Sequence, residues 1–168
     1  MNHKMHYALV PKNGSYRGID RAMSTEDIFP GRKYSAKDLE LYFDFVNDTD
    51  LSPTAPTLET LKKYKQQFEQ YHANCEIILY GDHPLHPPES EAYHFLGIDI
   101  VNDGGSFLEN PNWNPSGVRA LLNSDGLCST LDVAKKVQQI LCAVDQCPLT
   151  LCWVYLYCPA QTSASTDS

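Results

Sequence analysis

Residues 149–157 (LTLCWVYLY) constrain the fold of this chain more than any other stretch. The segment is apolar at nearly every position, whereas a strand with one face in water alternates between apolar and polar side chains. A strand with this pattern lies in the middle of a sheet that is covered on both faces, or it reaches a sheet edge or interface where another molecule covers it. The favoured fold therefore supplies packing layers for both faces of a sheet.

Three further segments have the composition of strands: residues 5–10, 75–80 and 91–101. Residues 39–46 (LELYFDFV) fit two structures. Alternation of apolar and polar residues, together with the aromatic content, favours a strand. A helix that begins after Ser35 would also place apolar residues on one face. We take the strand as the expected structure of this segment.

Helical periodicity is clearest in residues 57–72 and 129–143. Thr57 stands where the N-cap of the first helix belongs, and Ser129 stands at the corresponding position of the second. Shorter helical segments are expected at residues 24–28 and 115–122.

Together these segments predict an α+β fold, with a mostly antiparallel or mixed sheet of about five strands and two or three helices packed on it. The expected order is β–β–α–β–β–α–α–β, which lacks the regular alternation of a doubly wound parallel sheet. We expect one domain over residues 1–159, followed by a disordered tail at residues 160–168, which are small and polar.

The six cysteines are expected to be free thiols. A chain of 168 residues buries enough apolar surface to fold without disulfides or a structural metal, and it contains no C-x-x-C pair that would suggest zinc. No stretch approaches the roughly 20 apolar residues of a membrane span, and the first residues lack the apolar core of a secretory signal. We therefore expect a cytoplasmic protein.

The net charge of −8 is concentrated in one half of the chain. Residues 1–74 are neutral, whereas residues 75–168 contain eleven acidic and only three basic side chains. Such a surface repels nucleic-acid phosphates and attracts cationic proteins. The composition therefore argues against nucleic-acid binding and favours a protein partner with a basic surface.

Residues 81–88 (GDHPLHPP) place a carboxylate close to two imidazoles, those of Asp82, His83 and His86. These groups could ligate a metal or transfer protons, with Asp99 as a further carboxylate. This arrangement defines one alternative, a small metal-dependent hydrolase. The simpler interpretation is a surface loop stiffened by prolines, which prevent the regular helix that would align the two histidines.

Asp99 lies in the middle of a predicted strand. Because Leu96, Ile98 and Ile100 supply one apolar side of that strand, we expect the Asp99 carboxylate on the opposite, solvent-exposed side. The sequence contains no nucleophile elbow, no H-E-x-x-H pair and no phosphate-binding glycine loop. It therefore favours a non-catalytic protein that needs no cofactor.

An acidic surface with an aromatic anchor is the predicted site for the partner. The predicted partner-binding residues are Asp82, Glu89, Glu91, Asp99, Asp103, Glu109 and Trp113. A further alternative is a structural or oligomer-forming subunit, with residues 149–157 at a sheet edge or interface.

Two segments, LGIDIVNDGGS (residues 96–106) and LLNSDGLCSTLDVAKKV (residues 121–137), combine a strand ending in LGxDI, an LNxxGL turn and a helix. In this pattern the chain resembles small bacterial proteins, many of which are encoded beside polymorphic or contact-dependent toxins as immunity proteins. The resemblance implies a stable cytosolic scaffold, a surface complementary to one toxin, and no catalytic site.

Overall fold

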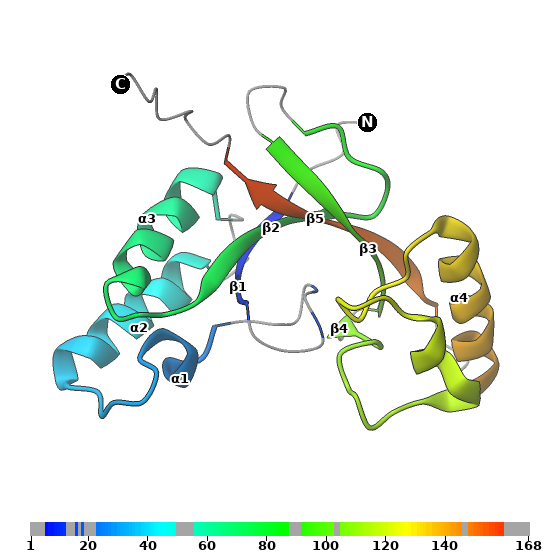
Figure 1. Ribbon diagram of the computed structural model, residues 1–168, viewed down its shortest axis with the longest axis horizontal. Coiled ribbons are helices and arrows are strands. Elements are labelled where there is room, and N and C mark those ends of the chain that lie inside the picture. Colours follow the sequence, from blue (N-terminus) through cyan, green and yellow to red (C-terminus); the bar gives the residue numbers. More distant parts are fainter. Residues whose placement is uncertain are drawn as a thin grey trace, which may run out of the picture.

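The computed structural model has an α+β fold in which helices pack on one curled, five-stranded antiparallel sheet (Figure 1). It describes residues 6–12, 16, 18, 23–49, 56–87, 92–102, 105–145 and 148–159. The elements are β1 (His6–Pro11), α1 (Thr25–Ile28), α2 (Ala36–Thr49), α3 (Leu58–Glu69), β2 (Cys75–Gly81), β3 (Ala92–Asn102), β4 (Gly105–Ser106), the 3₁₀ helix η1 (Pro115–Leu121), α4 (Leu131–Asp145) and β5 (Thr150–Cys158). The predicted fold class is confirmed, while the predicted tail at 160–168 lies outside the described residues.

The sheet has the strand order β1–β2–β5–β3–β4, and all neighbours run antiparallel. β5, which contains most of the apolar segment 149–157, lies between β2 and β3. The prediction of a central strand is confirmed, and the alternative that places this segment at a sheet edge is wrong. Because β2 and β3 both run antiparallel to β5, their carboxyl ends lie at the same end of the sheet.

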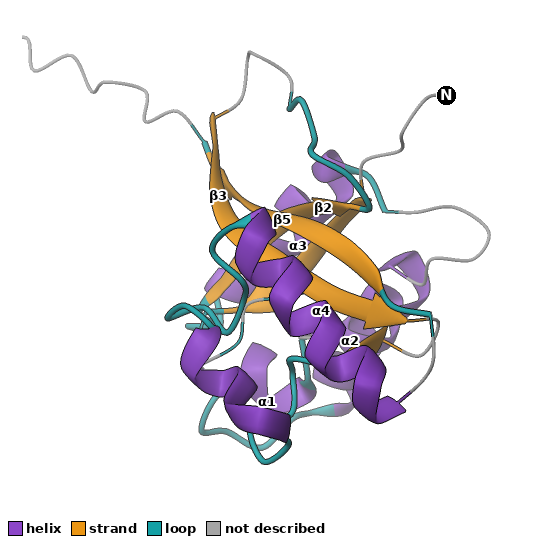
Figure 2. Ribbon diagram, turned by 90° about the vertical axis from the view of Figure 1, so that its right-hand side faces the viewer, coloured by secondary structure: helices purple, strands orange, loops and turns teal. Residues whose placement is uncertain are grey.

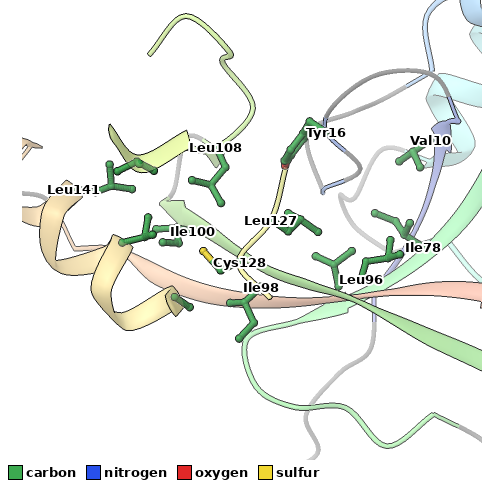
Figure 3. Packing of buried hydrophobic residues seen from close by; sticks show 14 residues of the cluster. Val10, Tyr16, Ile78, Leu96, Ile98, Ile100, Leu108, Leu127, Cys128 and Leu141 are labelled. Atoms are coloured by element: carbon green, nitrogen blue, oxygen red, sulfur yellow. The ribbon is translucent and has the colours of Figure 1, made fainter. Parts of the chain in front are cut away.

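The hydrophobic core consists of two clusters. In the side view α4 lies in front of the sheet, with α2 and α3 behind it (Figure 2). The cluster that involves α1, α2 and α3 includes Phe29, Phe45, Leu61, Phe68 and Ile77. The cluster on the other side includes Ile78, Leu96, Leu127, Val137 and Val154 (Figure 3). β2 contributes Ile77 to one cluster and Ile78 to the other, so both faces of this strand are covered.

The strand predicted for residues 39–46 is wrong, because these residues belong to α2. A capping box starts the helix: the Asp38 N–H donates to Ser35 Oγ (3.2 Å), and the Ser35 N–H donates to Asp38 Oδ2 (2.9 Å). The helix turns Phe45 onto α3, where its ring lies edge-on to Tyr64 and Phe68 at centroid distances of 5.3 and 5.1 Å. Capping and these aromatic contacts outweigh the alternating pattern, which carries only a weak preference of its own.

The other helices follow the predictions closely. Thr57 is the N-cap of α3, where its Oγ1 accepts a hydrogen bond from the Thr60 N–H (3.2 Å). In α4 the cap is Thr130 and not the predicted Ser129, because the Val133 N–H donates to Thr130 Oγ1 (3.2 Å). The expected short helical segments appear as α1 and η1.

The two segments of the LGxDI and LNxxGL pattern lie against each other. The Ile98 N–H donates to the Cys128 carbonyl (2.8 Å), and the Cys128 N–H donates back to Ile98 (2.9 Å). The Asn123 side chain donates to the carbonyl of Leu96 (2.9 Å), the extra residue in a β-bulge between Phe95 and Gly97. The turn therefore pairs with β3 through an isolated antiparallel bridge at Ile98.

Candidate protein-binding surface

The loop that follows β2 is held to the sheet by an apolar side chain. Leu85 is buried, and its N–H donates to the Tyr155 hydroxyl (3.3 Å). The Asp82 carboxylate is exposed and contacts His83 Nδ1, while His86 is exposed. Within the described part of the chain, which includes this loop and Asp99, no three His, Cys, Asp or Glu side chains are placed to hold a metal ion. The structure thus brings Asp82 and His83 together but does not assemble the larger site of the hydrolase alternative.

The expectation that Asp99 is exposed is wrong, since its side chain is 0% exposed. It accepts hydrogen bonds from the Tyr16 hydroxyl and from Ser106 Oγ (2.6 Å). Gly18 passes so close that a Cβ there would lie 2.5 Å from Asp99 Oδ2. Both faces of β3 are therefore covered, and Asp99 ties neighbouring segments together instead of contributing to a surface that a partner could reach.

The thiols beside Asp99 are protonated at neutral pH. Burial raises the pKa of Cys128 to about 12, and the Asp99 carboxylate adds to the shift. Burial also raises the pKa of Cys152 to about 12, and the Asp99 carboxylate again adds to the shift. A neutral buried thiol is a poor nucleophile, so this cluster lacks an activated cysteine.

Three of the remaining predicted contact residues, Asp82, Glu109 and Trp113, lie among the described residues. Asp82 and Glu109 are exposed. Trp113 is half-buried, with its ring 5.4 Å from that of Phe107, and it lines an open cleft of about 330 Å³ together with Val144. The other members of the predicted set, Glu89, Glu91 and Asp103, lie outside the described residues.

A different surface, on α2, combines apolar and acidic side chains. Phe43 is 58% exposed and Val46 is 40% exposed, and the half-buried Leu39 lies one helical turn before Phe43. The Tyr42 ring extends this strip, with its centroid 5.6 Å from that of Phe43. We define the α2 surface as Leu39, Phe43 and Val46 together with the adjacent carboxylates Glu40 and Asp44.

The two carboxylates of the α2 surface border a groove of about 270 Å³ between α2 and α3. Glu40 and Asp44 are exposed and stand one turn apart, where both could approach a single cation. Gln67 of α3 also lines the groove, and its buried Oε1 has no hydrogen-bond partner among the described residues. Lys37 is the basic residue among the described side chains of this groove. The two carboxylates against one lysine therefore give the lining of the groove a negative charge.

Sequence reasoning missed the α2 surface because the segment was assigned to a strand. In a strand, Leu39, Phe43 and Phe45 would share one face, which suggests a single buried side. In the helix that actually forms, Phe45 turns inward and Phe43 turns outward. The helical alternative contained the necessary signal, since residues 39, 43 and 46 fall on one line of a helix.

Comparison with protein-family models, with curated protein sequences and with solved structures finds no match for this chain. None of the helices among the described residues has the length and apolar character needed to cross a membrane.

Proposed function

We propose that this protein is a non-catalytic, cytosolic protein-binding module that docks a basic protein partner on the α2 surface. The observation that supports this most directly is the exposed apolar strip around Phe43, which lies beside two carboxylates on the same helix. Phenylalanine this exposed has an unfavourable contact with water that a partner would remove.

The partner that fits this surface presents apolar side chains bordered by lysine or arginine. Covering the exposed part of Phe43 contributes on the order of 1 kcal/mol, and covering Val46 adds to it. Glu40 and Asp44 would attract a basic side chain into the groove beside α3. Complementary charge mainly speeds and orients association. A second copy of this chain fits poorly, because the same carboxylates would face each other.

We further propose that the partner is a toxin domain that this protein neutralises as an immunity protein. The resemblance carried by residues 96–106 and 121–137 supports this narrower proposal. Neutralisation requires a stable scaffold and a complementary surface, and no bond-breaking chemistry. Asp82, Glu109 and Trp113 remain predicted contact residues outside the α2 surface.

The test is co-expression of the full chain with the products of neighbouring reading frames, followed by binding measurements on the pair that purifies at 1:1 stoichiometry. Phe43→Glu should weaken this complex at least tenfold, because it puts a charge at the centre of the apolar strip. Leu131→Glu is the matched control, since Leu131 is 41% exposed on α4, across the sheet from α2 (Figure 1). It should leave the affinity within about twofold.

Charge reversal at Glu40 and Asp44 to lysine should slow association at low salt by about tenfold, with less effect at high salt. A Phe43→Glu protein that binds as tightly as the wild type, or a complex lost only with Leu131→Glu, would refute docking on the α2 surface.

A further inference from the structure

The hydrogen-bonded ladder between β2 and β5 ends before either strand does. It extends from the pair Gly81 and Trp153 to the pair Ile78 and Leu156. Beyond that point β2 stays paired with β1 as far as Cys75, and β5 stays paired with β3 as far as Cys158. The two central strands therefore separate from each other while each keeps its outer neighbour.

If the ladder continued, the ends of β2 and β5 would form three more pairs, of which only the last involves a proline. Continuing the register would oppose Ile77 to Tyr157, Glu76 to Cys158 and Cys75 to Pro159. Proline has no N–H and cannot donate to a ladder. The separated ends of the strands border a cleft of about 550 Å³ beneath α3, which we call the β2–β5 cleft. Its volume lies within the usual range of small-molecule sites.

The floor of the β2–β5 cleft is apolar. It is formed by Ile77, Leu156 and Tyr157. Cys75 also lines it, and burial raises the pKa of this thiol to about 11. The Cys75 thiol is therefore neutral at pH 7 and acts as a small apolar wall instead of a nucleophile.

Basic side chains surround this apolar floor. Lys12, Lys62 and Lys65 line the cleft against two carboxylates, Glu69 and Glu76, which leaves a net positive charge in a protein whose total charge is −8. The Lys62 ammonium lies 5.2 Å from the centre of the Tyr157 ring and 3.4 Å from Oε1 of the exposed Glu59, and Lys65 pairs with Glu69 on the same helix. These contacts hold both lysines at the cleft.

We propose that the β2–β5 cleft binds a small amphipathic anion, with its acidic group at the lysines and its apolar body on the floor. An apolar pocket with a few convergent polar groups is the usual form of a ligand site. An added peptide strand fits less well, because the separated stretch is only three residues long on β2 and two on β5. The α2 surface takes no part in this proposal, which stands independently of the proposed function.

The probes for this test are decanoate and the fluorescent sulfonate 8-anilinonaphthalene-1-sulfonate, titrated into the full chain by calorimetry and fluorescence. We expect saturable 1:1 binding of both, with each displacing the other. The Lys62→Gln/Lys65→Gln double variant should weaken decanoate binding at least tenfold. Lys135→Gln/Lys136→Gln is the matched control, because it removes the same charge from the exposed face of α4. It should leave the affinity within twofold.

Uncharged 1-decanol should bind at least tenfold more weakly than decanoate, since it lacks the charge that the lysines would recognise. Backbone chemical shifts recorded during the decanoate titration should move for residues 75–77 and 156–158. The proposal is overturned if decanoate shows no saturable binding below about 1 mM. It is also overturned if the two double variants lose affinity equally, or if the shift changes fall elsewhere.

Discussion

At the scale of single residues, Gly97 shows how β3 accommodates the segment that pairs with it at Cys128. Its φ is +148°, a conformation that side chains rarely adopt. A Cβ at this position would lie 2.8 Å from both the Cys128 carbonyl oxygen and the Leu127 Cβ. The absent side chain therefore permits the paired hydrogen bonds between Ile98 and Cys128.

Gly97→Ala should lower the free energy of unfolding by about 2–4 kcal/mol, because backbone strain and overpacking act together. Urea denaturation would measure the loss. Gly31→Ala is the control, since Gly31 has φ +70° but no atom within 4 Å of its added Cβ. That variant should lose only about 1 kcal/mol. Equal losses of unfolding free energy in the two variants would show that the close contacts of the added Cβ at position 97 do not destabilise the protein.

At the scale of elements, α2 depends on the carboxylate at its amino-terminal end. Asp38 accepts hydrogen bonds from the Ser35 N–H (2.9 Å) and from Arg32 Nη2 (2.7 Å). Arg32 in turn stacks over Tyr71, with its guanidinium carbon 5.0 Å from the ring centre. The start of α2 is thereby connected both to the segment before it and to the turn after α3.

The hydrogen bond from the Ser35 backbone, aided by Arg32, holds the pKa of Asp38 below its ordinary value. The stabilisation is therefore complete above that ordinary value, near pH 4, and is lost as the pH falls through the lower pKa of the folded state. Asp38→Asn should flatten the fall in unfolding free energy below pH 4, as measured by urea titrations at several pH values. An acid limb as steep as that of the wild type would contradict this role.

At the scale of the whole molecule, packing on both faces of the sheet divides the cysteines into two groups. Those in the strands and in the segment paired with β3 are buried free thiols: Cys75, Cys128 and Cys152. Cys142 and Cys158 are free and only half-buried. Cys147 lies outside the described residues. Reagents reach the buried group only when the structure opens.

Iodoacetamide at pH 8 should therefore alkylate Cys142 and Cys158 at least tenfold faster than Cys128 and Cys152, with peptide mass mapping as the readout. Burial raises the pKa values of Cys128 and Cys152 in the folded protein to about 12. Both thiols are therefore protonated at neutral pH, where the stabilisation linked to these raised pKa values is fully present. It should decline as the pH rises above about 9. Equal alkylation rates in the native protein would argue against a covered sheet.

Local pattern was enough to predict several features of the fold. The apolar run in β5 indicated a central strand, and the apolar stripes of α3 and α4 indicated helices that pack on one side. The same reasoning could not identify residues 39–46 as part of a helix, and it could not predict that Asp99 is buried. Residues 39–46 satisfy two periodicities, and the capping box at Ser35 together with the contacts of Phe45 with α3 favours the helix.

The sequence by itself determined where apolar side chains recur, and hence the fold class and the position of β5. Only the tertiary structure decided which surfaces stay exposed. Asp99 is buried by Tyr16, which is 83 residues away along the chain, and Phe43 is exposed because no described segment covers it. Periodicity is a local property, whereas burial depends on segments that meet only after folding. The candidate surfaces on α2 and in the β2–β5 cleft therefore emerge from the assembled fold.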